Sequence, residues 1–203
     1  MKVLLINGSP HENGCTDAAL KVLSEEFFKQ GIGTDMMHIG RTVCGCMACG
    51  QCADIGKCIM EDRVNDALAK ARHADGFVFG SPVYYASPNG SMVAFMDRFF
   101  KAGNITHKPA AVLATARRGG NVAALDVLLK YPQYRQMPIV TADYWPVIYG
   151  SKPEEILADK EGIYTMQRLA KNMAWLMKCI EKGKEEGIYP DCSEKNVWTA
   201  FYK

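Results

Sequence analysis

Short apolar runs alternate with longer amphipathic stretches along most of the chain, and this alternation constrains the fold more than any other feature. It is typical of a parallel β-sheet covered by helices, because a strand buried on both faces is apolar throughout and a surface helix only on one side. The apolar runs predict strands over residues 3–6, 34–39, 77–79, 110–114 and 137–141. The amphipathic stretches predict helices over residues 17–30, 63–71, 92–101, 122–130 and 161–182, and Asp62 is expected to cap the second of them.

Five strands alternating with helices fit a flavodoxin-like α/β fold, a doubly wound five-stranded parallel sheet with helices on both faces, better than a six-stranded dinucleotide-binding fold. We expect residues 1–203 to form one such domain, with a cysteine-rich insertion at about 44–58 and a tail at about 188–203. Right-handed crossovers would bring the loops after the first, third and fourth strands to one edge of the sheet. A ligand is expected there.

The charge balance excludes several classes of partner. Lysine and arginine number 24 and aspartate and glutamate 22, so the net charge of +2 gives no field that would attract nucleic acid or an anionic membrane. No apolar run approaches the roughly 20 residues that span a bilayer. The apolar run at the start of the sequence is too short for a secretory signal. We therefore expect a cytoplasmic protein without nucleic-acid or membrane partners.

The loop at residues 8–16 reads GSPHENGCT and leads directly into a predicted helix. Backbone N–H groups at a helix N-terminus bind a phosphate, and the hydroxyls of Ser9 and Thr16 can add donors. The loop contains no lysine, which disfavours a nucleoside triphosphate, whereas the monoester of flavin mononucleotide (FMN) suits it. The alternative is a ligand-free loop in which Thr16 caps the helix. Cys15 also lies at the helix start, where the pKa of a thiol is expected to fall.

Two later loops carry groups that suit a flavin ring. Residues 80–90 hold the adjacent Tyr84 and Tyr85, which could stack on a planar ring or pack beneath the loop. Residues 115–120 pair two glycines with Arg117 and Arg118. The backbone N–H groups and the arginines of this loop could favour a reduced, anionic flavin. Alternatively, the arginines could bind a phosphate of NADPH or be solvated.

Five of the eight cysteines lie between residues 44 and 58. From Cys46 the spacing is C-x2-C-x2-C-x5-C. Four cysteines at this spacing could ligate a [4Fe–4S] cluster, and they are Cys46, Cys49, Cys52 and Cys58. Cys44 is then surplus. Zinc fits less well, because its sites generally separate two cysteine pairs by a longer stretch. Reduced thiols, or disulfides formed on isolation, are the remaining alternatives.

Aromatic residues outside these loops suggest contacts between subunits. Tyr144 and Trp145 follow the predicted fifth strand and could cover a flavin or fill a subunit contact. Trp198, Phe201 and Tyr202 lie in the tail and would expose more apolar area than a monomer tolerates, which indicates a homo-oligomer.

Several motifs together resemble the NADPH-dependent FMN reductase family, in its iron–sulfur flavoprotein branch. They are GSP at 8–10, GCT at 14–16, the cysteine run at 46–58, GSPVY at 80–84, FMDR at 95–98, YW at 144–145, YG at 149–150 and NMAW at 172–175. The resemblance implies a flavodoxin-like fold, bound FMN, homodimers or homotetramers, and one- or two-electron redox chemistry.

The resemblance also implies roles for individual residues. The phosphate of FMN would be held by Ser9, Asn13, Gly14, Cys15 and Thr16. Its ring would be lined by Pro82, Val83, Tyr84, Tyr85 and Ser87, and flanked on the other edge by Thr115, Arg117, Gly119 and Gly120. Two departures from the family pattern stand out: Cys15 replaces the usual asparagine, and the Arg117-Arg118 loop is more basic than in many relatives.

The resulting hypothesis is an FMN-dependent oxidoreductase that takes electrons from NAD(P)H and delivers them to a second acceptor, through an iron–sulfur cluster if one is present. No protein side chain is expected to act as a nucleophile or general base, because the flavin does the chemistry. Two alternatives remain: an iron–sulfur flavoprotein electron carrier without its own substrate, and a thiol redox sensor.

Overall fold

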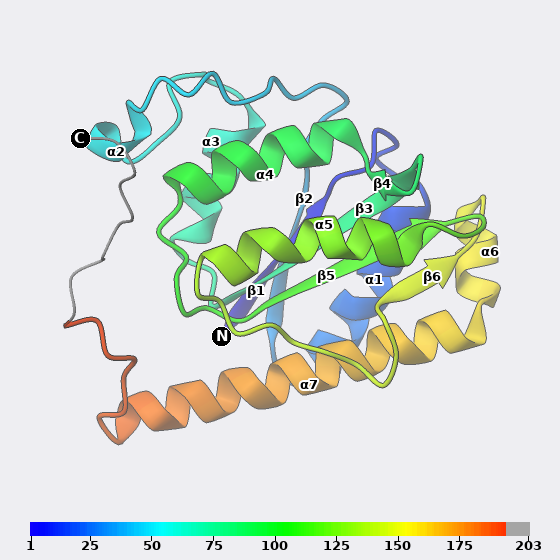
Figure 1. The fold of residues 1–203 in the computed structure, drawn as a ribbon. Helices are drawn as coiled ribbons and strands as arrows, with labels where there is room; N and C mark the ends of the chain where they lie inside the picture. The colour runs from blue at the N-terminus through cyan, green and yellow to red at the C-terminus, as the bar shows by residue number, and fades with distance from the viewer. Residues whose placement is uncertain (194–203) are drawn as a thin grey trace.

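A parallel sheet of five strands forms the centre of the computed structural model, which describes residues 1–193 (Figure 1). The strands lie in the order β2-β1-β3-β5-β6, and a short β4 pairs antiparallel with the end of β3. Their bounds are Lys2–Asn7 (β1), Gly33–His38 (β2), Gly76–Tyr84 (β3), Ser87–Pro88 (β4), Ala110–Ala116 (β5) and Val147–Tyr149 (β6). This order is that of a doubly wound flavodoxin-like sheet, which confirms the predicted fold.

Helices cover both faces of the sheet (Figure 1). One face carries α1 (Cys15–Lys29), α6 (Pro153–Ala158) and α7 (Lys160–Glu185). The other carries α3 (Arg63–Ala71), α4 (Gly90–Ala102) and α5 (Asn121–Tyr134), and the short α2 (Cys52–Ile55) lies within the cysteine-rich segment. Asp62 caps α3 as predicted, because its carboxylate accepts a hydrogen bond from the backbone N–H of Val64 at 3.1 Å. Within residues 1–193, no helix has the length and apolar character needed to cross a membrane.

The strands are apolar throughout because they face a core on each side. Leu4 and Ile6 of β1 pack with α3, α4 and α5, and Leu5 between them packs with α1 and α7. Side chains of a strand alternate between the two faces of the sheet, so a doubly covered strand needs apolar residues at every position. The core beneath α4 is largely aromatic, with Phe99 in edge contact with Phe77 and Phe79 at centroid distances of 5.9 Å.

The prediction of a strand at residues 137–141 is wrong. This segment makes only an isolated bridge, between Ile139 and Ala110 at the start of β5. The fifth strand is β6, which pairs in parallel with residues 114–116 at the end of β5. Pro138 and Pro146 have no backbone N–H to donate, which limits the hydrogen bonds that residues 138–146 can form with β5. The apolar run was recognisable, whereas a three-residue strand carries too little periodicity to detect.

The third predicted strand, residues 77–79, is longer in the structure. Gly80, Ser81 and Pro82 continue it because they pair with Leu113, Ala114 and Thr115 of β5. The aromatic tail residues Trp198, Phe201 and Tyr202 lie outside the described residues, and the homo-oligomer inferred from them stays a prediction.

Replacing Phe99 by alanine should destabilise the fold strongly. Phe99 is completely buried, and removing a core phenylalanine typically costs about 3–5 kcal/mol. The matched control is Phe28→Ala, because Phe28 is 82% exposed on α1 and its loss should change the free energy of unfolding by less than about 0.5 kcal/mol. Urea unfolding followed by circular dichroism measures both. Equal destabilisation by the two variants would contradict the assigned core.

Candidate functional site

The loops after β1, β3, β5 and β6 meet at one edge of the sheet and enclose a cavity of about 450 Å³, here called the first cavity. Its lining residues are Ser9, His11, Gly14, Cys15, Thr16, Pro82, Val83, Tyr84, Thr115, Ala116, Arg117, Gly150, Ser151 and Pro153. The first three of these loops were expected to converge, and the structure brings them together.

Glycines let the loops approach this closely. The backbone N–H of Gly8 donates to the carbonyl oxygen of Gly80 at 2.8 Å. A Cβ atom on Gly8 would lie 2.9 Å from that oxygen, and a Cβ on Gly80 would lie 2.9 Å from the Cγ2 of Thr16. Neither contact is sterically tolerable, so the junction of the first loop with β3 requires glycine at both positions.

Asn7, at the end of β1, holds the loop that follows in shape. It is 2% exposed; its Oδ1 accepts from the N–H of Ser9 at 3.0 Å and its Nδ2 donates to the carbonyl of Glu12 at 3.2 Å. From β2, the Nε2 of His38 donates to the carbonyl of Ser9 at 2.6 Å. Both supporting residues were missed in the sequence. A polar residue closing an apolar strand is a usable signal for Asn7, but nothing local marks His38.

A buried hydroxyl pair joins the first and third loops. The Oγ1 atoms of Thr16 and Thr115 lie 3.0 Å apart, and both side chains are almost fully buried. Thr16 stands in the first turn of α1, whose N-cap Gly14 offers no side-chain acceptor. The first N–H groups of this helix are therefore not satisfied by a cap, which makes them available to an anion in the cavity.

The loop after β3 is a tight hairpin. Val83 and Tyr84 pair with Pro88 and Ser87, which leaves Tyr85 and Ala86 as a two-residue turn with φ of +50° and +57°. Both central residues of such a turn need positive φ, a region that non-glycine residues seldom occupy. Tyr84 lines the first cavity, whereas Tyr85 is completely exposed.

Nine of the fourteen predicted flavin residues line the first cavity. The other five, Asn13, Tyr85, Ser87, Gly119 and Gly120, are outside its lining. Gly120 instead supports the hairpin: its φ is +99°, and a Cβ there would lie 3.0 Å from the Cα of Ala86. Both arginines are exposed, and of the two Arg117 belongs to the cavity lining.

The structure adds a fourth loop that the sequence analysis missed. Gly150, Ser151 and Pro153 follow β6 and line the first cavity. Gly150 was noted only as part of the family motif at 149–150, and none of the three was assigned to the site because the fifth strand was placed too early. Because the fifth strand begins later than predicted, Tyr144 and Trp145 precede it instead of following it. They line a different cavity, beside Leu125 and Leu129 of α5.

Cys15 does not behave as its position at a helix start suggested. Burial raises the pKa of its thiol, and this outweighs a lowering by a backbone hydrogen bond; Glu155 and Glu154 raise it further. The expectation of a lowered pKa is therefore wrong. The sulfur donates instead to the carbonyl of Gly150 at 3.6 Å, so Cys15 connects the first and fourth loops.

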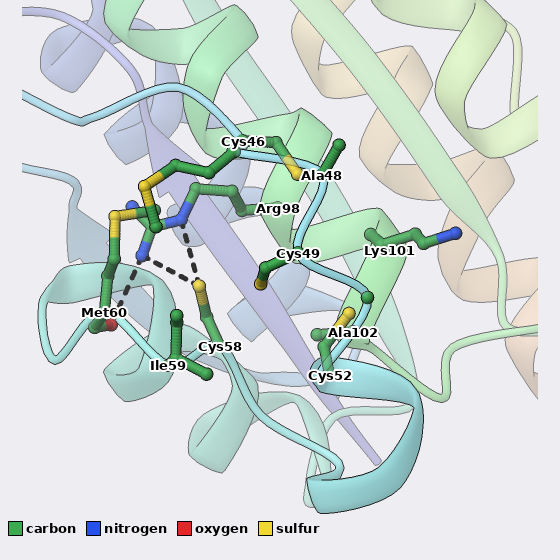
Figure 2. Close-up of a pocket in the computed structure, with 12 residues that line it drawn as sticks. Cys46, Ala48, Cys49, Cys52, Cys58, Ile59, Met60, Arg98, Lys101 and Ala102 are labelled. Carbon is green, nitrogen blue, oxygen red and sulfur yellow. Dashed lines mark hydrogen bonds between the residues drawn. The ribbon is translucent and has the colours of Figure 1, made fainter.

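Cys46, Cys49, Cys52 and Cys58 line a second cavity of about 200 Å³ (Figure 2). Among the described residues, no three histidine, cysteine or carboxylate side chains converge closely enough to hold a single metal ion. A [4Fe–4S] cluster differs, because each iron takes one cysteine and the four thiolates surround a cavity. The donor set therefore fits such a cluster.

Arg98 of α4 reaches into the second cavity (Figure 2). Its Nε and Nη2 lie 3.3 and 3.2 Å from the Sγ of Cys58, and its Nη1 lies 2.6 Å from a carboxylate oxygen of Asp62. Burial acts to lower the pKa of Arg98, but hydrogen bonds to Asp62 and Cys58 outweigh it and hold the pKa above its ordinary value. The guanidinium therefore keeps its charge inside the protein.

The first cavity presents a chemically mixed set of donors. The hydroxyls of Ser9 and Thr16 and the uncapped start of α1 line it, together with the ring of Tyr84 and the guanidinium of Arg117. This set fits a molecule that carries a phosphate monoester at one end and a flat aromatic ring at the other.

Comparison with known proteins gives consistent results. The family model of the NADPH-dependent FMN reductases matches residues 1–151. An iron–sulfur flavoprotein of Methanocaldococcus jannaschii is 29% identical over 194 residues, covering 90% of this chain and 100% of the relative. One of Methanosarcina thermophila is 26% identical, covering 92% and 100%. The structure of a flavodoxin from the domain Archaea has a TM-score of 0.61 at 16% identity, covering 88% of this chain and 99% of that one.

The pKa of Cys15 predicts a pH dependence of its chemical reactivity. Because only the thiolate reacts with iodoacetamide, Cys15 in the flavin-free protein should be alkylated at an appreciable rate only above the ordinary thiol value of roughly 8.5. Mass spectrometry of quenched samples between pH 7 and 10 measures this rate. Cys179, an exposed thiol on α7, is the internal comparison. Alkylation of Cys15 as fast as that of Cys179 at pH 8 would contradict the prediction.

Proposed function

The chain belongs to the NADPH-dependent FMN reductase family, and from this membership we propose that it is an FMN-dependent oxidoreductase that takes electrons from NAD(P)H and exchanges them with a [4Fe–4S] cluster. The observation that carries the proposal is the convergence of the loops after β1, β3 and β5 on one cavity, joined by the Thr16–Thr115 hydrogen bond. When bound, FMN supplies the redox chemistry, accepting electrons in pairs and releasing them singly.

The roles of the residues follow from their places around the first cavity. Ser9, Thr16 and the free N–H groups at the start of α1 would hold the phosphate of FMN, because they offer neutral donors at the positive end of a helix. Tyr84 would pack against the ring, and Arg117 would stabilise negative charge on it. The five predicted flavin residues outside the lining would contribute only if they move toward the ligand or act through the loops they support. They are Asn13, Tyr85, Ser87, Gly119 and Gly120.

The second cavity supplies the other half of the proposal. Cys46, Cys49, Cys52 and Cys58 would hold the cluster, which would transfer single electrons. The relatives from M. jannaschii and M. thermophila are both named iron–sulfur flavoproteins, which supports a cluster in this chain. The same observation favours a second candidate function, an electron carrier whose flavin is reduced through the cluster and not by a nicotinamide.

Three broader expectations stay proposals. We propose that residues 1–203 form one domain, that the chain assembles into homodimers or homotetramers, and that it works in the cytoplasm with an acceptor of unknown identity.

Replacing Ser9 by alanine should weaken FMN binding selectively. The Oγ of Ser9 already accepts from the N–H of His11 at 3.1 Å, so its own proton is available to a phosphate oxygen. Losing a hydrogen bond to a charged group costs about 1.5–3 kcal/mol, which corresponds to at least roughly tenfold weaker binding. Riboflavin lacks the phosphate, so its affinity should not change.

Quenching of flavin fluorescence measures both affinities. Ser91→Ala is the matched control, because Ser91 donates to the carbonyl of Arg41 and is outside the first-cavity lining. Equal weakening of FMN and riboflavin by Ser9→Ala would show that this serine does not contact the phosphate.

Anaerobic purification followed by stopped-flow mixing tests the function as a whole. The purified protein should contain FMN, iron and sulfide, and excess NADPH or NADH should bleach the flavin absorbance within a catalytic turnover time. Reduction by a one-electron iron–sulfur donor, with no response to either nicotinamide, would favour the carrier. Protein without flavin absorbance, even after incubation with FMN and desalting, would overturn both functions.

A further inference from the structure

Arg98 is a charged side chain in an unusual position. Only 1% of it is exposed, although it extends from α4 toward a cavity lined by thiols (Figure 2). Burying a guanidinium is unfavourable unless its donors are all satisfied. Its hydrogen-bond partners therefore indicate what the burial achieves.

Those partners all belong to the cysteine-rich segment or its immediate continuation. Nη1 donates to the carbonyl of Cys44 at 3.3 Å, and Nη2 donates to the carbonyl of Met60 at 3.3 Å. Both terminal nitrogens also contact the carboxylate of Asp62, at 2.6 and 2.9 Å. One side chain thus connects the beginning and the end of the segment to α4. Cys44, surplus to the cluster motif, takes part through its backbone oxygen.

Cys58 is the thiol that this arrangement singles out. It receives hydrogen bonds from both Nε and Nη2 of Arg98, at 3.3 and 3.2 Å (Figure 2). In the part of the chain that the structure describes, none of the other three thiols receives a hydrogen bond from a charged group. Cys46 and Cys49 are exposed, and Cys52 is half-buried like Cys58 itself, so the hydrogen bonds from Arg98 and not burial distinguish Cys58. The four cysteines are therefore electrostatically unequal.

Asp62 fixes the orientation of the guanidinium. Its Oδ1 accepts from the N–H of Val64 at 3.1 Å as well as from Nη2 of Arg98, so the carboxylate is held by the first turn of α3. A guanidinium gripped by a bidentate carboxylate on one side can present its remaining donors in a fixed direction. Here that direction is toward the sulfur of Cys58.

We propose that Arg98 is a positioning residue for the cluster: it fixes Cys58 as the ligand attached to the protein core and, through two hydrogen bonds to that sulfur, raises the reduction potential of the cluster. The inference rests on the proposed function, since it needs a cluster in the second cavity. Hydrogen bonds to a ligating sulfur withdraw negative charge from the cluster. The reduced state carries one more negative charge, so these donors stabilise it more than the oxidised state.

The experiment compares Arg98→Lys with Lys101→Gln in the anaerobically purified full-length protein. Arg98→Lys keeps the positive charge but cannot fork between the sulfur, the two carbonyls and the carboxylate. Lys101 lines the same cavity from the same helix, and its amine points away from Cys58 (Figure 2), so its replacement removes a charge without removing a hydrogen bond to sulfur. Iron and sulfide per FMN are measured first. The potential of the cluster follows from a redox titration monitored by electron paramagnetic resonance.

Arg98→Lys should lower the iron content at unchanged FMN content, or keep full iron content with a potential more negative than that of the wild type. Lys101→Gln should show a smaller shift, because its exposed charge is screened by water. Full iron content with an unchanged potential in Arg98→Lys would overturn the inference, as would an equal or larger shift in Lys101→Gln. Wild-type protein that binds FMN but no iron would overturn the cluster in the proposed function and the inference with it. If the wild type contains the cluster but Arg98→Lys changes neither iron content nor potential, the inference about Arg98 is wrong and the proposed function stands.

Discussion

The parallel pairing of β1 with β3 and of β3 with β5 determines where every loop of the first cavity lies. Parallel strands joined by helical crossovers end at the same edge, so the strand pairing alone makes neighbours of three segments separated by tens of residues. The hydrogen bond from Gly8 to Gly80 and the one between Thr16 and Thr115 then close the remaining gaps. The site depends on the register of the sheet more than on any single contact.

Much of the fold could be read from the sequence because its strands are buried on both faces and its helices on one. The cap at Asp62, the order of the strands and the convergence of three loops all follow from periodicity and topology. The prediction of the fifth strand failed because residues 137–141 have the composition of a strand but make only an isolated bridge to β5, whereas the true strand has three residues. Because this strand was misplaced, the loop containing Gly150 and Ser151 was not assigned to the site.

The candidate site was predictable at the level of loops and not of side-chain contacts. The short-range motifs marked Ser9, Thr16 and Tyr84 correctly as residues near the edge of the sheet, and these line the first cavity. Contacts across long sequence separations, such as His38 to Ser9 and Arg98 to Cys58, leave no local pattern. The pKa of Cys15 was misjudged for the same reason: the helix start is visible in the sequence, but the burial that dominates is not.

The hairpin after β3 has a property that bears on how this scaffold can diversify. Its two tip residues, Tyr85 and Ala86, hold a backbone conformation that costs on the order of 1 kcal/mol or more for each, and the pairing of Val83 with Pro88 keeps them there. The phenol of Tyr85, in contrast, is fully exposed to solvent. A rigid backbone thus carries a side chain free of packing demands, and exchange at this tip can alter the chemistry displayed beside the first cavity while the sheet stays as it is.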